Sequence, residues 1–173
     1  MSSAVLDIKN LSVAFDTPDG VVEAVKGVSL TIAKGECLGI VGESGSGKTQ
    51  TFLSAFGLSA ENARVTGSVK FSGQEALGLT RKELDNIRGR YVAFVFQDPL
   101  TALTPHLSIG RQMCEGLTHH LQLTPARARE RAEEWLERVR LPDATRCFNQ
   151  YPHELSGGMR QRVTIAMAMM CEP

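Results

Sequence analysis

The sequence has no net charge and no long hydrophobic run, and each absence removes a class of function. Lys plus Arg and Asp plus Glu both number 19, so no global field draws the chain to nucleic acid or to anionic lipid. The longest apolar run near the end, 165–171, is far shorter than the roughly 20 residues of a membrane-spanning helix. A role at a membrane would therefore require docking on another protein.

Cysteine is scarce and dispersed. No two of the four form a C-x-x-C pair, and none of the four histidines stands at ligand spacing from a cysteine. We therefore expect no zinc site and predict reduced thiols in a cytosolic compartment. Residues 1–7 have neither a basic start nor an apolar core, so no signal peptide is predicted.

What is present is the composition of a soluble globular chain, with 42% apolar and 22% charged residues. The 173 residues fit one domain, or one domain lacking a piece. Near-alternation over 6–15, a turn at 17–20 and returning strands at 21–25 and 28–32 predict a β-rich beginning. A further strand is predicted over 65–71.

Two short apolar runs do not alternate, namely 37–41 and 91–96. Such runs predict strands that are buried on both faces of a parallel sheet. The first run leads into a glycine-rich loop and a predicted helix over 48–56.

Capping signals predict three further helices. Thr80 and Glu83 form a capping box that opens a short helix. Thr124 and Pro125 supply an N-cap and a first-turn proline for a charged helix to about residue 140. Ser156 caps a long, mostly apolar helix that runs to the last residues.

The loop over 42–49 matches the pattern G-x-x-x-x-G-K-[ST] in full. Its glycines let successive backbone N–H groups face phosphate oxygens, and the following helix adds its positive end. Lys48 supplies a cation for the β- and γ-phosphates, and Thr49 offers a hydroxyl to Mg²⁺. A chance match is the alternative, and the strand before and helix after it argue against chance. The predicted nucleotide contacts are Gly42, Glu43, Ser44, Gly45, Ser46, Gly47, Lys48, Thr49 and Gln50.

A second serine and glycine cluster stands at 155–162, with the sequence LSGGMRQR. Ser156 followed by Gly157 and Gly158 at a helix start makes a second anion site. The alternative interpretation is an ordinary N-cap followed by two glycines.

Three segments together, 41–48, 96–105 and 151–162, resemble the ATP-binding subunits of ABC transporters, most of all the oligopeptide, dipeptide and nickel importers. The resemblance covers essentially the whole chain, although Met159 stands where Gln is commonest and Thr104 where Asn is. It implies an α/β P-loop NTPase of ABC type, with a RecA-like core, an antiparallel β-subdomain and a helical subdomain, truncated before the Walker B strand. One incomplete domain would then divide into 1–97 (β-subdomain and P-loop core), 98–155 (helical subdomain) and 156–173 (signature helix).

The resemblance also implies roles for single residues. Phe15 would stack on adenine, with an ordinary core or hairpin phenylalanine as the alternative. Gln97 would touch Mg²⁺ and the attacking water, with a polar strand end as the alternative. Lys48 and Gln97 would be catalytic, and Thr49 and Gln97 would hold Mg²⁺ beside ATP. The signature contacts to nucleotide would come from Ser156, Gly157, Gly158 and Met159.

The same resemblance implies a peripheral protein at the cytoplasmic face of the cell membrane. Its partners would be a second ABC ATPase subunit, in a homo- or heterodimer, and transmembrane permease subunits. An extracytoplasmic solute-binding protein would act indirectly, and nucleic acid would not be a partner. The full-length protein would be an ABC-type ATPase that powers import of peptides or similar small solutes.

No apolar run of four residues precedes Asp-Glu or Asp-Asp in this sequence, so the Walker B motif is missing and this chain is predicted to be nearly inactive. Two alternatives stay open. One is a soluble ABC ATPase without a transport role, and the other is a truncated, catalytically inactive nucleotide-binding fragment.

Overall fold

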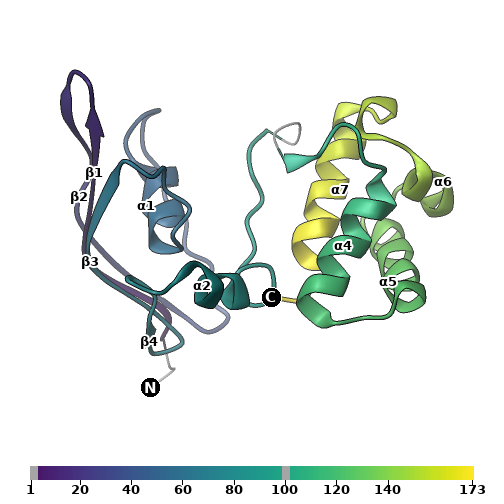
Figure 1. The fold of residues 1–173 in the computed structure, drawn as a ribbon, viewed down its shortest axis with the longest axis horizontal. Helices are drawn as coiled ribbons and strands as arrows, with labels where there is room; N and C mark the ends of the chain where they lie inside the picture. The colour runs from purple at the N-terminus through teal and green to yellow at the C-terminus, as the bar shows by residue number, and fades with distance from the viewer. Residues whose placement is uncertain (1–3, 99–101) are drawn as a thin grey trace. The chain divides into compact units, whose positions relative to one another are not determined.

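The computed structural model describes residues 4–98 and 102–173. The chain forms two compact units, Met1–Leu84 and Asp85–Pro173 (Figure 1). The predicted division at 97 and 155 stays a prediction. Pro99, within the predicted 96–105 segment, lies outside the described residues.

The first unit is built on a four-stranded antiparallel sheet in the order β2-β1-β3-β4. The predicted hairpin is confirmed, because β1 and β2 pair in register up to Thr17 opposite Gly20. The two strands predicted over 21–25 and 28–32 form one continuous strand, with register shifts that absorb the interruption. The strands are β1 (Ala4–Thr17), β2 (Gly20–Ala33), β3 (Ala63–Phe71) and β4 (Gln74–Glu75).

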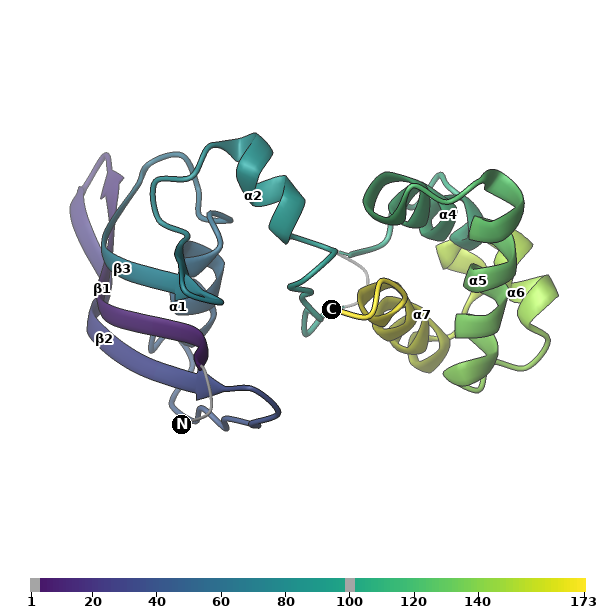
Figure 2. The same ribbon diagram turned by 90° about the horizontal axis from the view of Figure 1, so that it is seen from below.

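Helix α1 (Lys48–Ala55) packs against β1 and β2, and Figure 2 shows it lying along the sheet. The covered face carries buried apolar side chains at alternate positions along each strand, because successive side chains of a strand point to opposite faces of the sheet. Just after α1, the Phe56 ring meets the Phe71 ring edge to face at 6.0 Å. The buried residues of this core include Leu6, Ile8, Leu11, Val13, Val25, Ala55 and Val69.

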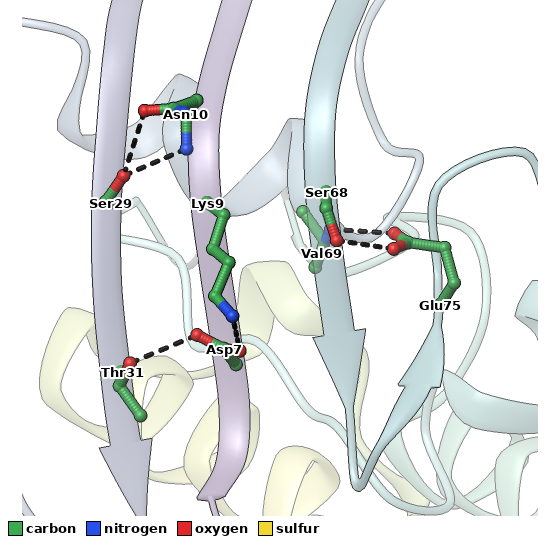
Figure 3. Close-up of polar contacts among 8 residues, drawn as sticks. All are labelled: Asp7, Lys9, Asn10, Ser29, Thr31, Ser68, Val69 and Glu75. Carbon is green, nitrogen blue, oxygen red and sulfur yellow. Dashed lines mark hydrogen bonds and ion pairs between the residues drawn. The ribbon is translucent and has the colours of Figure 1, made fainter.

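Polar side chains tie neighbouring strands together on this sheet (Figure 3). Asp7 accepts a hydrogen bond from the Thr31 hydroxyl at 3.1 Å. The Glu75 carboxylate accepts from the backbone N–H of Val69 at 2.7 Å and from the Ser68 hydroxyl. Burial alone would raise the pKa of Glu75, but these hydrogen bonds lower that pKa below its ordinary value.

The second unit is a helical cluster with its own apolar core (Figure 1). Met113, Leu117, Leu136 and Val163 are completely buried in it. The buried Gln112 amide holds a turn in place by bonding the backbone of Thr104 and Leu107. Its helices are α4 (Ile109–Leu121), α5 (Pro125–Arg138), α6 (Ala144–Asn149), η1 (Pro152–Glu154) and α7 (Gly157–Met169), and α2 (Arg81–Ile87) spans the boundary between the units.

The predicted helices are confirmed, and so are their caps. The Thr80 N–H donates to the Glu83 carboxylate at 2.7 Å at the start of α2. Thr124 caps α5 and Ser156 caps α7. Among the described residues, no helix is both long enough and apolar enough to cross a bilayer.

The two predicted buried strands at 37–41 and 91–96 are wrong. Both segments are irregular, and Val41 is 95% exposed and Phe96 43% exposed. A strand exists only when a neighbour accepts and donates its ladder hydrogen bonds. Across 4–98 and 102–173, the one pairing of either segment is an isolated bridge between Arg88 and Val92. Apolar composition alone therefore did not produce a strand here.

Candidate functional site

The loop over 42–47 turns sharply and leads directly into α1. The Ser46 N–H donates to the Glu43 carbonyl at 3.2 Å and closes a tight turn. Gly45 and Gly47 have φ angles of +81° and +89°, a region in which side chains are strained. The two glycines therefore set the curvature of the loop.

Gly47 is also confined by β2. A Cβ atom at Gly47 would lie 2.4 Å from the Ala24 carbonyl oxygen and 3.4 Å from a methyl group of Val25. The start of α1 therefore packs directly against the sheet. Sequence reasoning did not identify this backing by Ala24 and Val25, because nothing in the local pattern links residues more than twenty positions apart.

The start of α1 has no side-chain cap, since its N-cap residue is Gly47. In contrast, side chains cap α4, α5, α6 and α7. The first N–H groups of a helix have no acceptor within the helix, and they carry the positive end of its dipole. The start of α1 is thus built to receive an anion from outside the chain.

Lys48, the first residue of α1, directs its ammonium group back over the loop. Its Nζ donates to the carbonyl oxygens of Gly42 and Glu43, both at 2.7 Å, and to the Ser46 hydroxyl at 3.2 Å. These contacts hold a positive charge within the loop beside the uncapped helix start. A phosphate group would meet both the charge and the N–H groups there.

The next two residues of α1 differ in exposure. Thr49 is exposed, so its hydroxyl is accessible for the predicted role as an Mg²⁺ ligand. Gln50 is half-buried, and its side-chain carbonyl oxygen is buried without a hydrogen-bond partner. A buried unpaired acceptor costs free energy, which fits a position close to a polar ligand.

Phe15 is half-buried near the end of β1, opposite Val22 on β2 and Ala63 on β3. This position fits a ring with one packed side and one accessible side. Its stacking on adenine stays a prediction.

Gln97 lies in the second unit, in an irregular and exposed segment. The alternative interpretation of Gln97 as a polar strand end is wrong, because residues 91–96 form no strand. Its contact with Mg²⁺ and water stays a prediction.

The second predicted anion site lies at the start of α7. Ser156 has extended backbone, and its hydroxyl accepts from the Met159 N–H at 3.4 Å. Gly157 and Gly158 are exposed, and a Cβ on either would meet no atom within 4 Å. Their backbone is therefore accessible to a ligand.

The structure brings the 42–50 residues together as one loop and helix start in the first unit. It likewise brings Ser156, Gly157, Gly158 and Met159 together as one helix start in the second unit. Each of the two motifs is local, which is why the sequence pattern alone could locate both.

Comparison with known proteins finds relatives over nearly the whole chain. Residues 25–173 match the model of the family described as "ABC transporter". The oligopeptide transport ATP-binding protein OppD of Escherichia coli K12 is 46% identical over 172 residues, 99% of this chain and 51% of that protein. The dipeptide transport ATP-binding protein DppD of Bacillus subtilis 168 is 46% identical over 171 residues, 98% of this chain and 51% of that protein.

Solved structures agree with this. The ATP-binding cassette MJ0796, in a dimeric post-hydrolysis state bound to ADP and Pi, superposes with a TM-score of 0.85 at 31% identity. The match covers 97% of this chain and 70% of that chain. The chain spans about half the length of the transport proteins it matches.

Proposed function

The chain belongs to the ABC transporter family, and from this premise we propose that it is the nucleotide-binding part of an ATPase subunit that powers peptide import. The single observation that carries the proposal is the uncapped start of α1 beside the Lys48 ammonium. The names of OppD and DppD, both peptide transport ATP-binding proteins, support the choice of peptide over other solutes.

ATP would bind with its phosphates at the 42–49 loop. Lys48 would exchange its bonds to loop carbonyls for bonds to phosphate oxygens, and the first N–H groups of α1 would donate to the same group. Thr49 would hold Mg²⁺, which neutralises phosphate charge when bound. Phe15 would pack against the adenine ring.

A second copy or a related subunit would supply the other half of the site. The exposed N–H groups of Gly157 and Gly158, with Ser156 and Met159, would face the nucleotide on the partner's loop. The dimeric state of MJ0796 supports such an arrangement. Closure of the dimer on ATP and reopening after hydrolysis would shift the membrane subunits between two states.

Hydrolysis needs a group that polarises the attacking water. The sequence of residues 1–173 contains no apolar run of four residues followed by Asp-Glu or Asp-Asp. We propose that the protein at its natural length hydrolyses ATP, whereas residues 1–173 alone bind nucleotide and turn it over hardly at all.

The proposed partners follow from the transport role. They are a second ATPase subunit, permease subunits that carry the chain at the cytoplasmic face of the membrane, and a solute-binding protein that delivers peptide to the permease. We propose that the helical unit, which has an apolar core of its own, offers the surface for the permease.

The first experiment is intact-mass measurement of the native protein, followed by ATP turnover at that length. A mass above 18.8 kDa with turnover that Lys48→Ala abolishes is the expected result. A mass equal to this chain would limit it to nucleotide binding.

Peptide import is tested by uptake of a labelled oligopeptide in cells that lack the gene. Restoration by the wild-type gene and not by Lys48→Ala is expected. Capture of ribosomes instead of membrane subunits would favour a soluble ATPase and contradict the transport role.

A further inference from the structure

Two arginines in the first turns of α7 donate to backbone carbonyl groups of the chain itself. Arg160 Nε donates to the Pro152 carbonyl at 2.7 Å, and its Nη2 reaches the His153 carbonyl at 3.5 Å. Arg162 Nη1 donates to the carbonyl oxygens of Arg140 at 2.8 Å and Val139 at 3.2 Å. Both guanidinium groups are thus engaged, although they stand beside a predicted anion site.

The acceptors are carbonyl groups at the ends of two preceding helical segments. Pro152 and His153 are the first two residues of η1, which Leu155 separates from Ser156. Val139 is the C-cap of α5, and Arg140 has a φ of +57° that ends the helix. The carbonyls of Val139 and Arg140 lie at the C-terminal end of α5, where carbonyls lack partners within the helix and carry partial negative charge. The Pro152 carbonyl also accepts from the Leu155 N–H at 3.2 Å. Arg162 therefore completes the end of α5, and the two arginines link α5 and η1 to α7.

The start of α7 depends on such links because it contains two consecutive glycines. Gly157 and Gly158 lose more conformational freedom on ordering than any other residue, and neither has a side chain that could anchor it. Anchors in the residues just before them exist instead. Leu155 is 2% exposed in the core, and Glu154 accepts from the Tyr151 N–H at 2.7 Å.

We propose that Arg160 and Arg162 are positioning residues that fix the start of α7 in one orientation, and that neither is a ligand of the bound anion. Arg160 contributes more than Arg162 to this ordering, because Arg160 is half-buried and its hydrogen bond holds the turn next to Ser156. Arg162 is exposed and braces the more distant end of α5, where solvent weakens the contact. The consequence for catalysis rests on the proposed function.

The direct test is amide hydrogen exchange of the full-length protein without nucleotide, comparing Arg160→Ala and Arg162→Ala with Arg127→Ala. Arg127 is a matched control, because its guanidinium pairs with the exposed Glu130 carboxylate at 2.7 Å on its own helix. Peptides over 151–159 should exchange about tenfold faster in Arg160→Ala, and less so in Arg162→Ala. Arg127→Ala should match the wild type there. Exchange in Arg160→Ala within about twofold of wild type would overturn the proposal.

The second measurement separates positioning from anion binding. Arg160→Ala should lower the kcat of ATP hydrolysis about tenfold, with KM and the Kd for MgADP within about twofold of wild type. Arg160→Lys should recover only part of the kcat, because an ammonium group cannot reproduce the planar fork that spans two carbonyls. Full recovery by lysine would show that the charge alone matters and would overturn the positioning role.

If Arg160→Ala does not fold, Arg160→Lys is measured instead, and exchange over 151–159 must still exceed that of Arg127→Ala. If the wild type neither binds nor hydrolyses ATP, the proposed function fails, while hydrogen exchange still decides whether the arginines order the start of α7.

Discussion

The two glycine-flanked helix starts of this chain solve opposite problems. The start of α1 has an N-cap glycine at φ +89° and no side-chain cap, with Lys48 turned back over the loop. The start of α7 has a capping serine and two arginines that brace the turn before it. The first leaves its N–H groups for an outside acceptor, whereas the second is ordered by contacts within its own unit.

The difference shows that two glycine-flanked helix starts can expose their N–H groups in different ways. At α1, charge and unpaired donors are concentrated in the loop, so the binding free energy is expected to reside there. At α7, the contacts order the backbone and leave Gly157 and Gly158 exposed. Binding there is expected to depend on orientation more than on charge.

The largest effect is expected from substitution of Gly47. Gly47→Ala would place a Cβ 2.4 Å from the Ala24 carbonyl at a positive φ, so the free energy of unfolding should fall by about 3 to 5 kcal/mol. Gly78→Ala is the matched control, because Gly78 has a φ of +86° and open space around it. It should cost only about 1 to 2 kcal/mol. Urea unfolding measures both free energies. Equal losses in the two variants would show that the close contact of Gly47 with β2 is unimportant.

The next effect tests the charge at α1. Lys48→Ala should raise the Kd for MgADP about tenfold to a hundredfold, because charge-assisted bonds to phosphate are lost. Lys34→Ala, which removes an exposed lysine outside the loop, should leave the Kd unchanged. Titration with a fluorescent nucleotide measures both. If the two variants behaved alike, the α1 start would not be the phosphate site.

A smaller effect is expected at the α7 cap. Ser156→Ala should lower the free energy of unfolding by about 1 kcal/mol, and the Kd for MgADP of the same chain should not change. Thr124→Ala removes the equivalent cap of α5 and should cost a similar amount. Only Ser156→Ala should also reduce ATP turnover, which steady-state kinetics would reveal. A loss of turnover in both would point to general destabilisation.

The smallest effect concerns pH and compares the two units. Burial lowers the pKa of His120 below its ordinary value of 6.5, with His119 adding to the shift and Asp85 opposing it. The neutral form is therefore favoured by folding, so its stabilisation is present above pH 6.5 and is lost as the pH falls through the lowered value. The hydrogen bonds that lower the pKa of Glu75 likewise stabilise the first unit above pH 4.5, and this stabilisation is lost as the pH falls through the lowered pKa.

The second unit should therefore weaken first as the pH falls. Trp135, the one tryptophan of the sequence, reports on that unit in urea unfolding. We expect the urea midpoint of the wild type to be lower just below pH 6.5 than just above it. This drop should be smaller in His120→Gln. A midpoint that is constant over this range would refute the assignment to His120.

Predictability from the sequence followed the range of the interactions. The caps at Thr80, Thr124 and Ser156 were correct, because a cap joins residues only three positions apart. The hairpin was correct because its turn is local. The strands at 37–41 and 91–96 were wrong, since a parallel strand depends on partners remote in sequence that the described residues do not supply.

By itself, the sequence determined the 42–49 loop, the 155–162 cluster and the helices that follow them, because glycine freedom and capping chemistry act within a few residues. Tertiary structure alone decided the rest. Contact with Ala24 makes glycine necessary at 47, and the ends of α5 and η1 hold Arg162 and Arg160. These contacts join residues from separate elements, and only folding brings their atoms within bonding distance.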